Sequence, residues 1–474
     1  MDPEERTQTG IRGLDENLEG GFPRGGMVMI AGNPGTGKTM LCGEFLYHGA
    51  AVRMENGIYV SFSEGRKTFL ENMRKFGRDF EGLEKLGRLE IMDVLTSKAP
   101  GIDAIMEMIT SKIDENRARR LVIDSYTAMA NAFPSPIDER VVLHLLSKIV
   151  RMTGCTTLLV MEVPTGRETI GTGIEEFIVD GNIILRRRLV DGSIMRELEV
   201  AKMRGTIIDK HMQVFSLHGG FTVFKPFREE PTEGTRPFRR IPGPPERFST
   251  GNPELDLVLG GYGRGDTVLV ELGEDIPLGA PASLFGPLCA NFLAHDMGVL
   301  LIPPCGQNVD RVMAWMGGYG LGEERLSRLM RIAEMRDAAA AGPPVFHMDP
   351  DDIRVSHRIW NEEKRKLTEA TGRPVLKLVN VDSAGIHWPL EQARRVMEAE
   401  SKATKDEGGL LSLLSMPGND WLGRDASNMS SIHLRLADER GVTLIQGVRP
   451  RTPLYALEST GEDGYPSVRL TPMK

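Results

Sequence analysis

The segment most informative about this chain is Gly32-Asn33-Pro34-Gly35-Thr36-Gly37-Lys38-Thr39, which has the pattern G-x-x-x-x-G-K-T. An apolar run at residues 27–31 precedes it, and residues 40–47 have the composition of a helix. A strand, a glycine-rich loop and a helix in this order are the context in which the pattern holds phosphate groups. Glycines let successive backbone N–H groups point at an anion, and the helix adds the positive end of its dipole. The segment therefore predicts a nucleoside triphosphate site.

The positions of this loop have separate expected roles. Lys38 is expected to reach the β- and γ-phosphates, and the Thr39 hydroxyl to bind Mg²⁺. ATP and Mg²⁺ are therefore the predicted cofactors. A glycine loop without a ligand is the alternative, and the flanking strand and helix argue against it. The predicted nucleotide-binding residues are Gly32, Asn33, Pro34, Gly35, Thr36, Gly37, Lys38, Thr39 and Met40.

Strand-like and helix-like segments alternate after the loop. The strand-like segments are 57–62, 89–93, 120–125 and 156–161, and the helix-like segments are 68–76, 102–115 and 141–151. Such alternation predicts an α/β fold with a mostly parallel sheet and helices on both faces. Ligands of such sheets bind at the carboxyl ends of the strands.

Two acids follow predicted strands at that edge. Asp124 ends the apolar strand 120–124 and is the predicted Walker B acid, a ligand of Mg²⁺. Glu64 follows the strand 57–62 and is the predicted general base for the water that attacks the γ-phosphate. The alternative for Glu64 is an acid that stabilises a helix N-terminus.

The overall composition restricts the class of protein. Of the 474 residues, 26% are charged and the formal net charge is -8, which disfavours nucleic acid as a partner. Four cysteines lack C-x-x-C spacing, which argues against a zinc site or a disulfide framework. No apolar run approaches the ~20 residues that span a bilayer. With an acidic N-terminus that lacks the apolar core of a signal peptide, we expect a cytoplasmic protein.

Several further segments resemble the KaiC family, within the RecA-like branch of P-loop ATPases. Residues 9–25 resemble the opening T-G-x-x-G-L-D…G-G-x-P-x-G motif of that family, and Val200 to Thr206 resembles its K-x-R-G signature. The resemblance runs over roughly Thr9 to Phe224. It implies a RecA-like core, ATP binding, ATP hydrolysis and a regulatory role. The phosphate loop together with the arginine cluster Arg186 to Arg188 gives a weaker resemblance to the gas-vesicle regulator GvpD.

The resemblance also implies an oligomer. Lys202 and Arg204 match family positions that project toward the γ-phosphate held by a neighbouring subunit, the role of an arginine finger. This arrangement requires a head-to-tail homo-oligomeric ring, and the family precedent is a hexamer. Without the resemblance, both side chains would be expected to face solvent.

One position departs from the family pattern. The family carries two adjacent glutamates after the second strand, and here the pair is Ser63-Glu64. Hydrolysis is therefore expected to be slow, and a switch that binds ATP without hydrolysing it is the alternative.

Three consecutive arginines, Arg186 to Arg188, lie before an Asp191-Gly192 turn that predicts a β-hairpin. They are expected to form a solvated or interface-facing edge. The alternative is a basic docking site for an acidic protein partner.

The second half of the chain repeats the start of the first. Residues 249–265 parallel residues 9–25, which indicates a duplication. Residues 272–281 contain Glu274 and Asp275 but no G-K-T, so this copy is expected to have lost triphosphate binding. Asp382 follows a strand that echoes residues 120–124 and is expected to be an inherited feature. The predicted domains are 1–227, a Pro- and Gly-rich linker at 228–247, and 248–474.

Three functions remain open at this point. The first is a KaiC-like regulatory ATPase that acts as a ring and hydrolyses ATP slowly. The second is a non-hydrolysing ATP-dependent switch that binds a protein partner, as GvpD-like regulators do. The third is a RecA-like DNA-dependent ATPase, which the acidic net charge disfavours.

Overall fold

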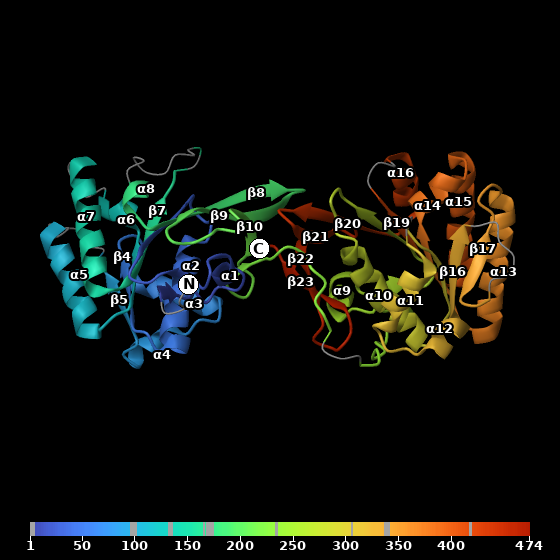
Figure 1. The fold of residues 1–474 in the computed structure, drawn as a ribbon, viewed down its shortest axis with the longest axis horizontal. Coiled ribbons are helices and arrows are strands. Elements are labelled where there is room, and N and C mark those ends of the chain that lie inside the picture. Colours follow the sequence, from blue (N-terminus) through green and yellow to red (C-terminus); the bar gives the residue numbers. More distant parts are fainter. Residues whose placement is uncertain are drawn as a thin grey trace. The chain divides into compact units, whose positions relative to one another are not determined.

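The computed structural model describes residues 5–94, 102–130, 136–164, 166, 175–232, 236–304, 307–335, 342–416 and 420–474. The chain divides into two compact units, one running to Lys225 and including Met473–Lys474, the other Pro226–Pro472 (Figure 1). Across these residues, no helix is both long and apolar enough to cross a bilayer.

The first unit alternates strands and helices along most of its length. Its elements are β1 (Arg6–Thr7), α1 (Leu14–Asn17), β2 (Phe22–Pro23), β3 (Met27–Gly32), α2 (Lys38–His48), η2 (Gly49–Arg53), β4 (Gly57–Ser61), α3 (Arg66–Lys75), α4 (Phe80–Lys85), β5 (Leu89–Asp93), α5 (Ile102–Asn116), β6 (Arg120–Asp124), α6 (Tyr126–Ala130), α7 (Pro136–Thr153), β7 (Thr156–Glu162), α8 (Glu175–Ile178), β8 (Gly181–Val190), β9 (Ser193–Met203), β10 (Met212–Ser216) and β11 (Thr222–Val223).

Nine of these strands form one sheet in the order β11-β10-β9-β8-β3-β7-β6-β4-β5. The strands from β8 to β5 are parallel, and β9, β10 and β11 extend the sheet by antiparallel pairing. The α/β fold with a mostly parallel sheet, predicted from the alternating pattern, is confirmed. The central place of β3 puts the loop that follows it at the middle of the carboxyl edge.

Both faces of this sheet are covered by helices, because side chains alternate along each strand. On one face, Val28 and Ile30 pack in a cluster that includes side chains of α2, α3 and α4. On the other face, Met27 and Met29 pack with side chains of α5 and α7. Figure 1 shows α5 and α7 on the opposite side of the sheet from α3 and α4. Burial on both faces fixes the register, and so fixes which residues reach the carboxyl edge.

The second unit has the same kind of architecture. Its elements are β12 (Arg247–Phe248), α9 (Pro253–Leu259), β13 (Tyr262–Gly263), β14 (Thr267–Leu272), α10 (Gly279–Ala294), β15 (Val299–Ile302), α11 (Val309–Gly317), α12 (Glu323–Leu329), β16 (Met330–Met335), β17 (Val345–Met348), α13 (Ile353–Thr371), β18 (Leu376–Asn380), α14 (Val381–His387), α15 (Leu390–Glu407), β19 (Leu410–Ser415), α16 (Asp420–Met429), β20 (Ile432–Glu439), β21 (Val442–Arg449), β22 (Leu454–Thr460) and β23 (Ser467–Pro472).

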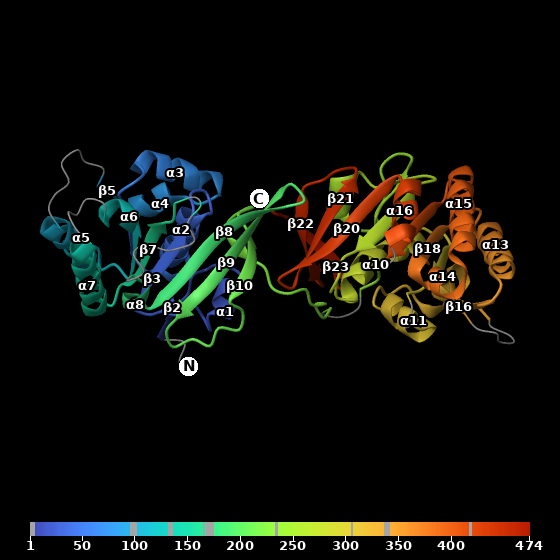
Figure 2. The same ribbon diagram turned by 90° about the horizontal axis from the view of Figure 1, so that it is seen from above.

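Its ten-stranded sheet has the order β17-β16-β15-β18-β19-β14-β20-β21-β22-β23. The strands from β17 to β20 are parallel, and β21 to β23 extend the sheet by antiparallel pairing (Figure 2). Two mostly parallel α/β sheets in tandem agree with the predicted duplication of a RecA-like core.

The strand ladders allow the two sheets to be compared position by position. Met27 at the start of β3 pairs with Thr157, and Thr157 pairs with Leu121 of β6. In the second sheet the corresponding pairs run from Thr267 through Leu411 to Lys377 of β18. Lys377 therefore corresponds to Leu121, and three residues further along each strand Asn380 corresponds to Asp124.

Asp382 lies two residues beyond that position. It belongs to α14, and its carboxylate accepts the backbone N–H of Met416 at 2.7 Å. The residue at the Walker B position of the second sheet is thus an amide, not a carboxylate.

Residues 228–247, predicted as a linker, belong to the second unit and in part pack into it. Phe238 is 6% exposed and contributes to its main hydrophobic cluster. The backbone N–H of Ile241 donates to the side chain of Asn291 in α10 at 2.8 Å.

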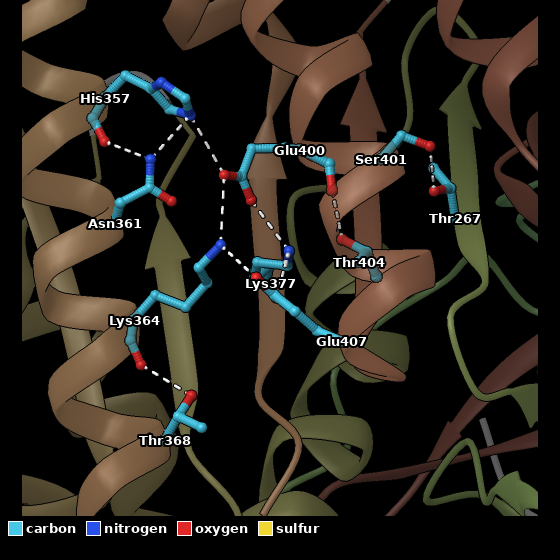
Figure 3. A network of polar contacts seen from close by, with 10 residues as sticks. All are labelled: Thr267, His357, Asn361, Lys364, Thr368, Lys377, Glu400, Ser401, Thr404 and Glu407. Carbon is cyan, nitrogen blue, oxygen red and sulfur yellow. Dashed lines mark hydrogen bonds and ion pairs between the residues drawn. The ribbon is translucent and has the colours of Figure 1, made fainter.

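A buried polar network joins β18 to the two helices that cover it, α13 and α15 (Figure 3). The Glu400 carboxylate accepts from Lys377 at 2.9 Å and lies 3.7 Å from the Lys364 ammonium and 3.3 Å from His357. Glu407 accepts from Lys364 at 2.8 Å. Lys377 is 1% exposed on its side chain, so its charge depends on these carboxylates.

Candidate functional site

The glycine-rich loop connects β3 to the N-terminus of α2, where an anion would meet backbone N–H groups and the helix dipole. Gly35 and Gly37 have φ angles of 76° and 107°, a region that side chains disfavour, so glycine is required for this curve. The Asn33 amide donates to the Val163 carbonyl at 3.0 Å and ties the loop to the end of β7. This hydrogen bond anchors the loop beside the end of the neighbouring strand.

The Lys38 ammonium lies inside the curve of the loop. It donates to the carbonyls of Gly32 at 2.9 Å and Asn33 at 3.0 Å. Burial lowers the Lys38 pKa, while the charges of Glu162 and Asp124 oppose that shift. A partly desolvated cation at the N-terminus of a helix, held by carbonyl groups of the loop, is suited to bind a polyphosphate. Met40 is buried in the core, so it can offer a phosphate only its backbone.

Thr39 and Asp124 meet at the same edge. The Thr39 hydroxyl donates to the Asp124 carboxylate at 2.8 Å, and the Tyr59 phenol donates to the same carboxylate oxygen at 2.8 Å. Burial, followed by the charge of Asp124, raises the Tyr59 pKa well above its usual range, so the phenol remains a donor. Among the residues described, no three His, Cys, Asp or Glu side chains group around a metal position. A hydroxyl and one carboxylate fit Mg²⁺, which takes its other ligands from phosphates and water.

Glu64 follows β4 on a turn closed by Ser61, whose hydroxyl accepts the Glu64 N–H at 3.1 Å. The Glu64 carboxylate accepts from the Asn72 amide at 2.8 Å. Burial and then the negative charge of Asp124 raise the Glu64 pKa, and the Asn72 hydrogen bond opposes this. A carboxylate whose pKa is raised toward neutral is suited to accept a proton from water.

Glu162 is a member of the site that the sequence alone did not reveal. It is the last residue of β7, the strand next to β3, and its negative charge favours the protonated form of Lys38 more than that of Asp124 does. Its backbone N–H donates to the Thr127 hydroxyl at 2.8 Å, which anchors the end of the strand. The available signal was an acid at the carboxyl end of a predicted strand, the same signal that singled out Asp124.

Arg196 was missed as well, because it lies far from the loop in sequence. It sits on β9 opposite Arg187 of β8, and its guanidinium donates to the Gly35 carbonyl at 2.9 Å. Burial and then the charge of Arg187 lower the Arg196 pKa. A Cβ at Gly35 would lie 3.4 Å from the Arg187 guanidinium. Two arginines of the hairpin thus lie beside the phosphate loop of their own chain.

The other two arginines of the predicted cluster pair across the hairpin. Arg186 forms an ion pair with Glu199, and Arg188 with Glu197 at 3.2 Å. All three arginines of 186–188 are exposed.

Lys202 and Arg204 lie at the opposite end of the sheet from the phosphate loop. Lys202 pairs with Asn182 near the start of β8, beside the start of β3. Its ammonium donates to the Val179 carbonyl at 2.8 Å, and Arg204 pairs with Asp180 at 3.1 Å. Because β3 rises by about 3.3 Å per residue, these side chains cannot reach the phosphate loop of their own domain.

The equivalent edge of the second unit has different chemistry. The β14–α10 connection, residues 273–278, carries exposed Glu274 and Asp275 and no lysine. With Asn380 in place of the Walker B acid, it offers no carboxylate for Mg²⁺ at that position, and the loop 273–278 has no lysine for a phosphate.

Comparison with known proteins gives the same family for the first unit. Residues 7–226 match the family described as ATPase: KaiC. A UPF0273 protein of Methanocaldococcus jannaschii is 34% identical over 218 residues, which are 42% of this chain and 88% of that protein. A UPF0273 protein of Thermotoga maritima is 33% identical over 239 residues, 45% of this chain and 98% of that protein.

The circadian clock oscillator protein KaiC of Thermostichus vulcanus is 30% identical over 273 residues, 56% of this chain and 51% of that protein. Among solved structures, a KaiC-like protein from Pyrococcus horikoshii is 34% identical with a TM-score of 0.43, and the match covers 46% of this chain and 99% of that chain.

Proposed function

The chain belongs to the KaiC family of ATPases through its first unit, and we propose that this unit binds ATP with Mg²⁺, hydrolyses it slowly and acts in a ring of identical subunits. The ring has a regulatory role. Whether ATP or ADP is bound sets the conformation or assembly state of the ring, and a protein partner recognises that state. The second unit takes no part in triphosphate binding.

One arrangement carries the proposal: Lys38, Thr39 and Asp124 converge at the mouth of a glycine loop. The hydrogen bond from Thr39 to Asp124 brings together the hydroxyl and the carboxylate that would share Mg²⁺. Lys38 lies beside them for the β- and γ-phosphates. Glu64 supplies a carboxylate with a raised pKa for the attacking water. Together, the four residues account for phosphate binding, for the Mg²⁺ ligands and for the general base.

The four residues named above do not include an arginine finger, a second positive charge that contacts the γ-phosphate in the transition state. Lys202 and Arg204 cannot supply it to their own loop, since they lie at the amino end of the sheet. They can supply it to a neighbour if subunits associate head to tail. This position supports a ring in which each site is completed by the next subunit.

The first experiment measures assembly and hydrolysis on the same samples. Size exclusion with light scattering is run with and without ATP–Mg²⁺, and phosphate release is followed in parallel. We expect nucleotide-dependent assembly and slow release in the wild type, and neither in Lys38→Ala. Arg74→Ala, an exposed arginine paired with Glu81, is the control and should behave as wild type. Wild-type assembly and release in Lys38→Ala would overturn the site assignment.

A mixing experiment tests sharing of the site between subunits. Glu64→Gln and Arg204→Ala are each expected to hydrolyse little alone. In a 1:1 mixture, about a quarter of the interfaces combine an intact Glu64 with an intact neighbouring Arg204, so activity should recover to roughly that fraction. Recovery shows that the two residues act from different subunits. Full activity of Arg204→Ala alone would contradict the proposal.

A second function is favoured by one observation. Ser63 stands where the resemblance leads one to expect an acid, which leaves Glu64 as the acid of the pair. If Glu64 cannot activate water alone, the protein is an ATP-dependent switch without turnover. ATP-dependent assembly with no phosphate release above the Lys38→Ala background would select this function.

A further inference from the structure

A cavity of about 350 Å³ lies in the second unit, between its sheet and helices α10 and α11. Phe285 of α10 and Trp315 of α11 form part of its wall, and the strand side is formed by residues such as Leu301 and Leu414. The size falls within the range of small-molecule sites in proteins, about 300–1,000 Å³. Glu229 and Arg311 also line it, and both are exposed.

Two buried polar side chains also line this apolar cavity. Asn380, 2% exposed, accepts the N–H and the hydroxyl of Ser383 on its Oδ1, at 2.7 and 2.8 Å. These bonds fix the orientation of the amide and leave Nδ2 as a donor. Neither Asn380 Nδ2 nor the Ser412 hydroxyl has a hydrogen-bond partner within the described parts of the chain. Because a buried donor without a partner is costly, both atoms are suited to a ligand that carries an acceptor.

The strand ladders of the two sheets show how the cavity arises. Tyr59 pairs with Val122 in the first sheet, and Leu301 pairs with the equivalent Leu378 in the second. Leu301 therefore takes the place of Tyr59, the phenol that donates to Asp124 in the first unit. Because leucine is smaller than tyrosine and has no hydroxyl, it leaves space at this strand end and gives the Asn380 amide no hydrogen-bond partner. The strand edge that is proposed to bind Mg²⁺ in the first unit thus corresponds to a largely apolar cavity in the second unit.

We infer that this cavity binds a small, uncharged, largely aromatic or aliphatic molecule with one carbonyl oxygen, which accepts from Asn380 Nδ2 and the Ser412 hydroxyl. The apolar body packs between Phe285 and Trp315. A carboxylate is disfavoured, because the polar groups of the inner wall, Asn380 and Ser412, are neutral, and the Arg311 side chain that also lines the cavity is exposed to solvent. A ligand here gives the second unit a sensing role that needs no nucleotide.

The test uses the full chain and three probes of similar size: acetophenone, ethylbenzene and sodium benzoate. Saturation-transfer NMR titrations measure the dissociation constant of each. Acetophenone is expected to bind at least about tenfold more tightly than ethylbenzene, since its carbonyl accepts two hydrogen bonds and a tenfold change corresponds to about 1.4 kcal/mol. Benzoate is expected to bind more weakly than acetophenone. Equal affinity for acetophenone and ethylbenzene overturns the inference. The absence of saturation transfer for all three probes also overturns it, because the cavity then binds none of them.

Variants locate the binding. Asn380→Asp keeps an acceptor for Ser383 but replaces the donor, and Ala282→Phe fills the cavity, so each should abolish acetophenone binding. Ser412→Ala should weaken it several-fold and should leave folding intact, because that hydroxyl has no hydrogen-bond partner among the residues that the structure describes. The control is Thr443→Val, which removes an equally buried and unpartnered hydroxyl on β21 outside the cavity. Binding that survives both Ser412→Ala and Ala282→Phe unchanged overturns the assignment.

Discussion

Replacing Glu400 by glutamine should destabilise the second unit in a manner that depends on pH. Burial raises the pKa of this carboxyl, but the His357 hydrogen bond and the charges of Lys377 and Lys364 outweigh it and lower the pKa from 4.5 to about 2. At 1.36 kcal/mol per unit, the shift corresponds to about 3 kcal/mol of stability.

The sign of the pH dependence follows from the direction of that shift. A carboxyl whose folded pKa is depressed contributes its full stability above its unfolded pKa, near 4.5, and loses it as pH falls toward about 2. The gap between wild type and Glu400→Gln should therefore be about 3 kcal/mol at pH 7. It should shrink steadily below pH 4.5.

Urea unfolding followed by tryptophan fluorescence is a selective assay, because all four tryptophans of the chain (Trp315, Trp360, Trp388 and Trp421) lie in the second unit. Titrations at pH 7, 5, 4 and 3 give the stability gap at each pH. Glu398→Gln on the same helix is the matched control, since Glu398 is half exposed and pairs with the exposed Arg394. It should change stability little at any pH.

A double variant distinguishes loss of the ion pair from a non-specific loss of stability caused by the substitution. Glu400→Leu with Lys377→Met removes both charges and should recover most of the stability lost in Glu400→Gln, because the single change leaves a buried ammonium without its main partner. A gap that stays constant from pH 7 to pH 3 would refute the assignment of the stability to this carboxylate.

Three further predictions concern the first unit. Tyr59→Phe should lower the free energy of unfolding by about 1.5–3 kcal/mol, the worth of a hydrogen bond to a charged group, measured by chemical denaturation at pH 7. Asn72→Ala removes a bond that lowers the Glu64 pKa, so the acid limb of the ATPase pH–rate profile should move to higher pH, and an unmoved limb would exclude Glu64 as the titrating base. Arg196→Met should weaken ATP binding several-fold in equilibrium dialysis, because its bond to the loop is lost, whereas exposed Arg186→Met should not.

The fold of the first unit was largely predictable because its signals are local. A glycine loop between a strand and a helix, and the alternation of apolar runs, need only neighbouring residues to be recognised. Convergence of Lys38, Thr39 and Asp124 followed from the rule that ligands bind at the carboxyl ends of parallel strands. The structure brings these three together.

The contacts that could not be predicted from sequence depend on strand order and register. Arg196 lies 161 residues from Gly35, and only the pairing of β8 with β3 and of β9 with β8 brings its hairpin to the loop. The same reason explains why Asp382 was matched to Asp124: both acids follow apolar runs, and only the ladder shows that Asn380 occupies the equivalent position. Register is a property of the folded sheet that a single strand does not carry.

The two units differ at the carboxyl edge of the sheet by more than the loss of the G-K-T motif. Restoring an acid by Asn380→Asp would still leave Leu301 without the hydroxyl that Tyr59 gives to Asp124. It would also place a carboxylate at the same edge as Glu274 and Asp275, where the loop supplies no lysine to balance it. The acid would keep the hydrogen bonds from the Ser383 N–H and hydroxyl, but the loop would still lack a lysine for the phosphates, so this edge cannot regain magnesium and triphosphate by a single change. Binding of a triphosphate in the second unit would therefore need at least three changes, which are an acid at position 380, a hydroxyl at position 301 and a lysine in the loop 273–278.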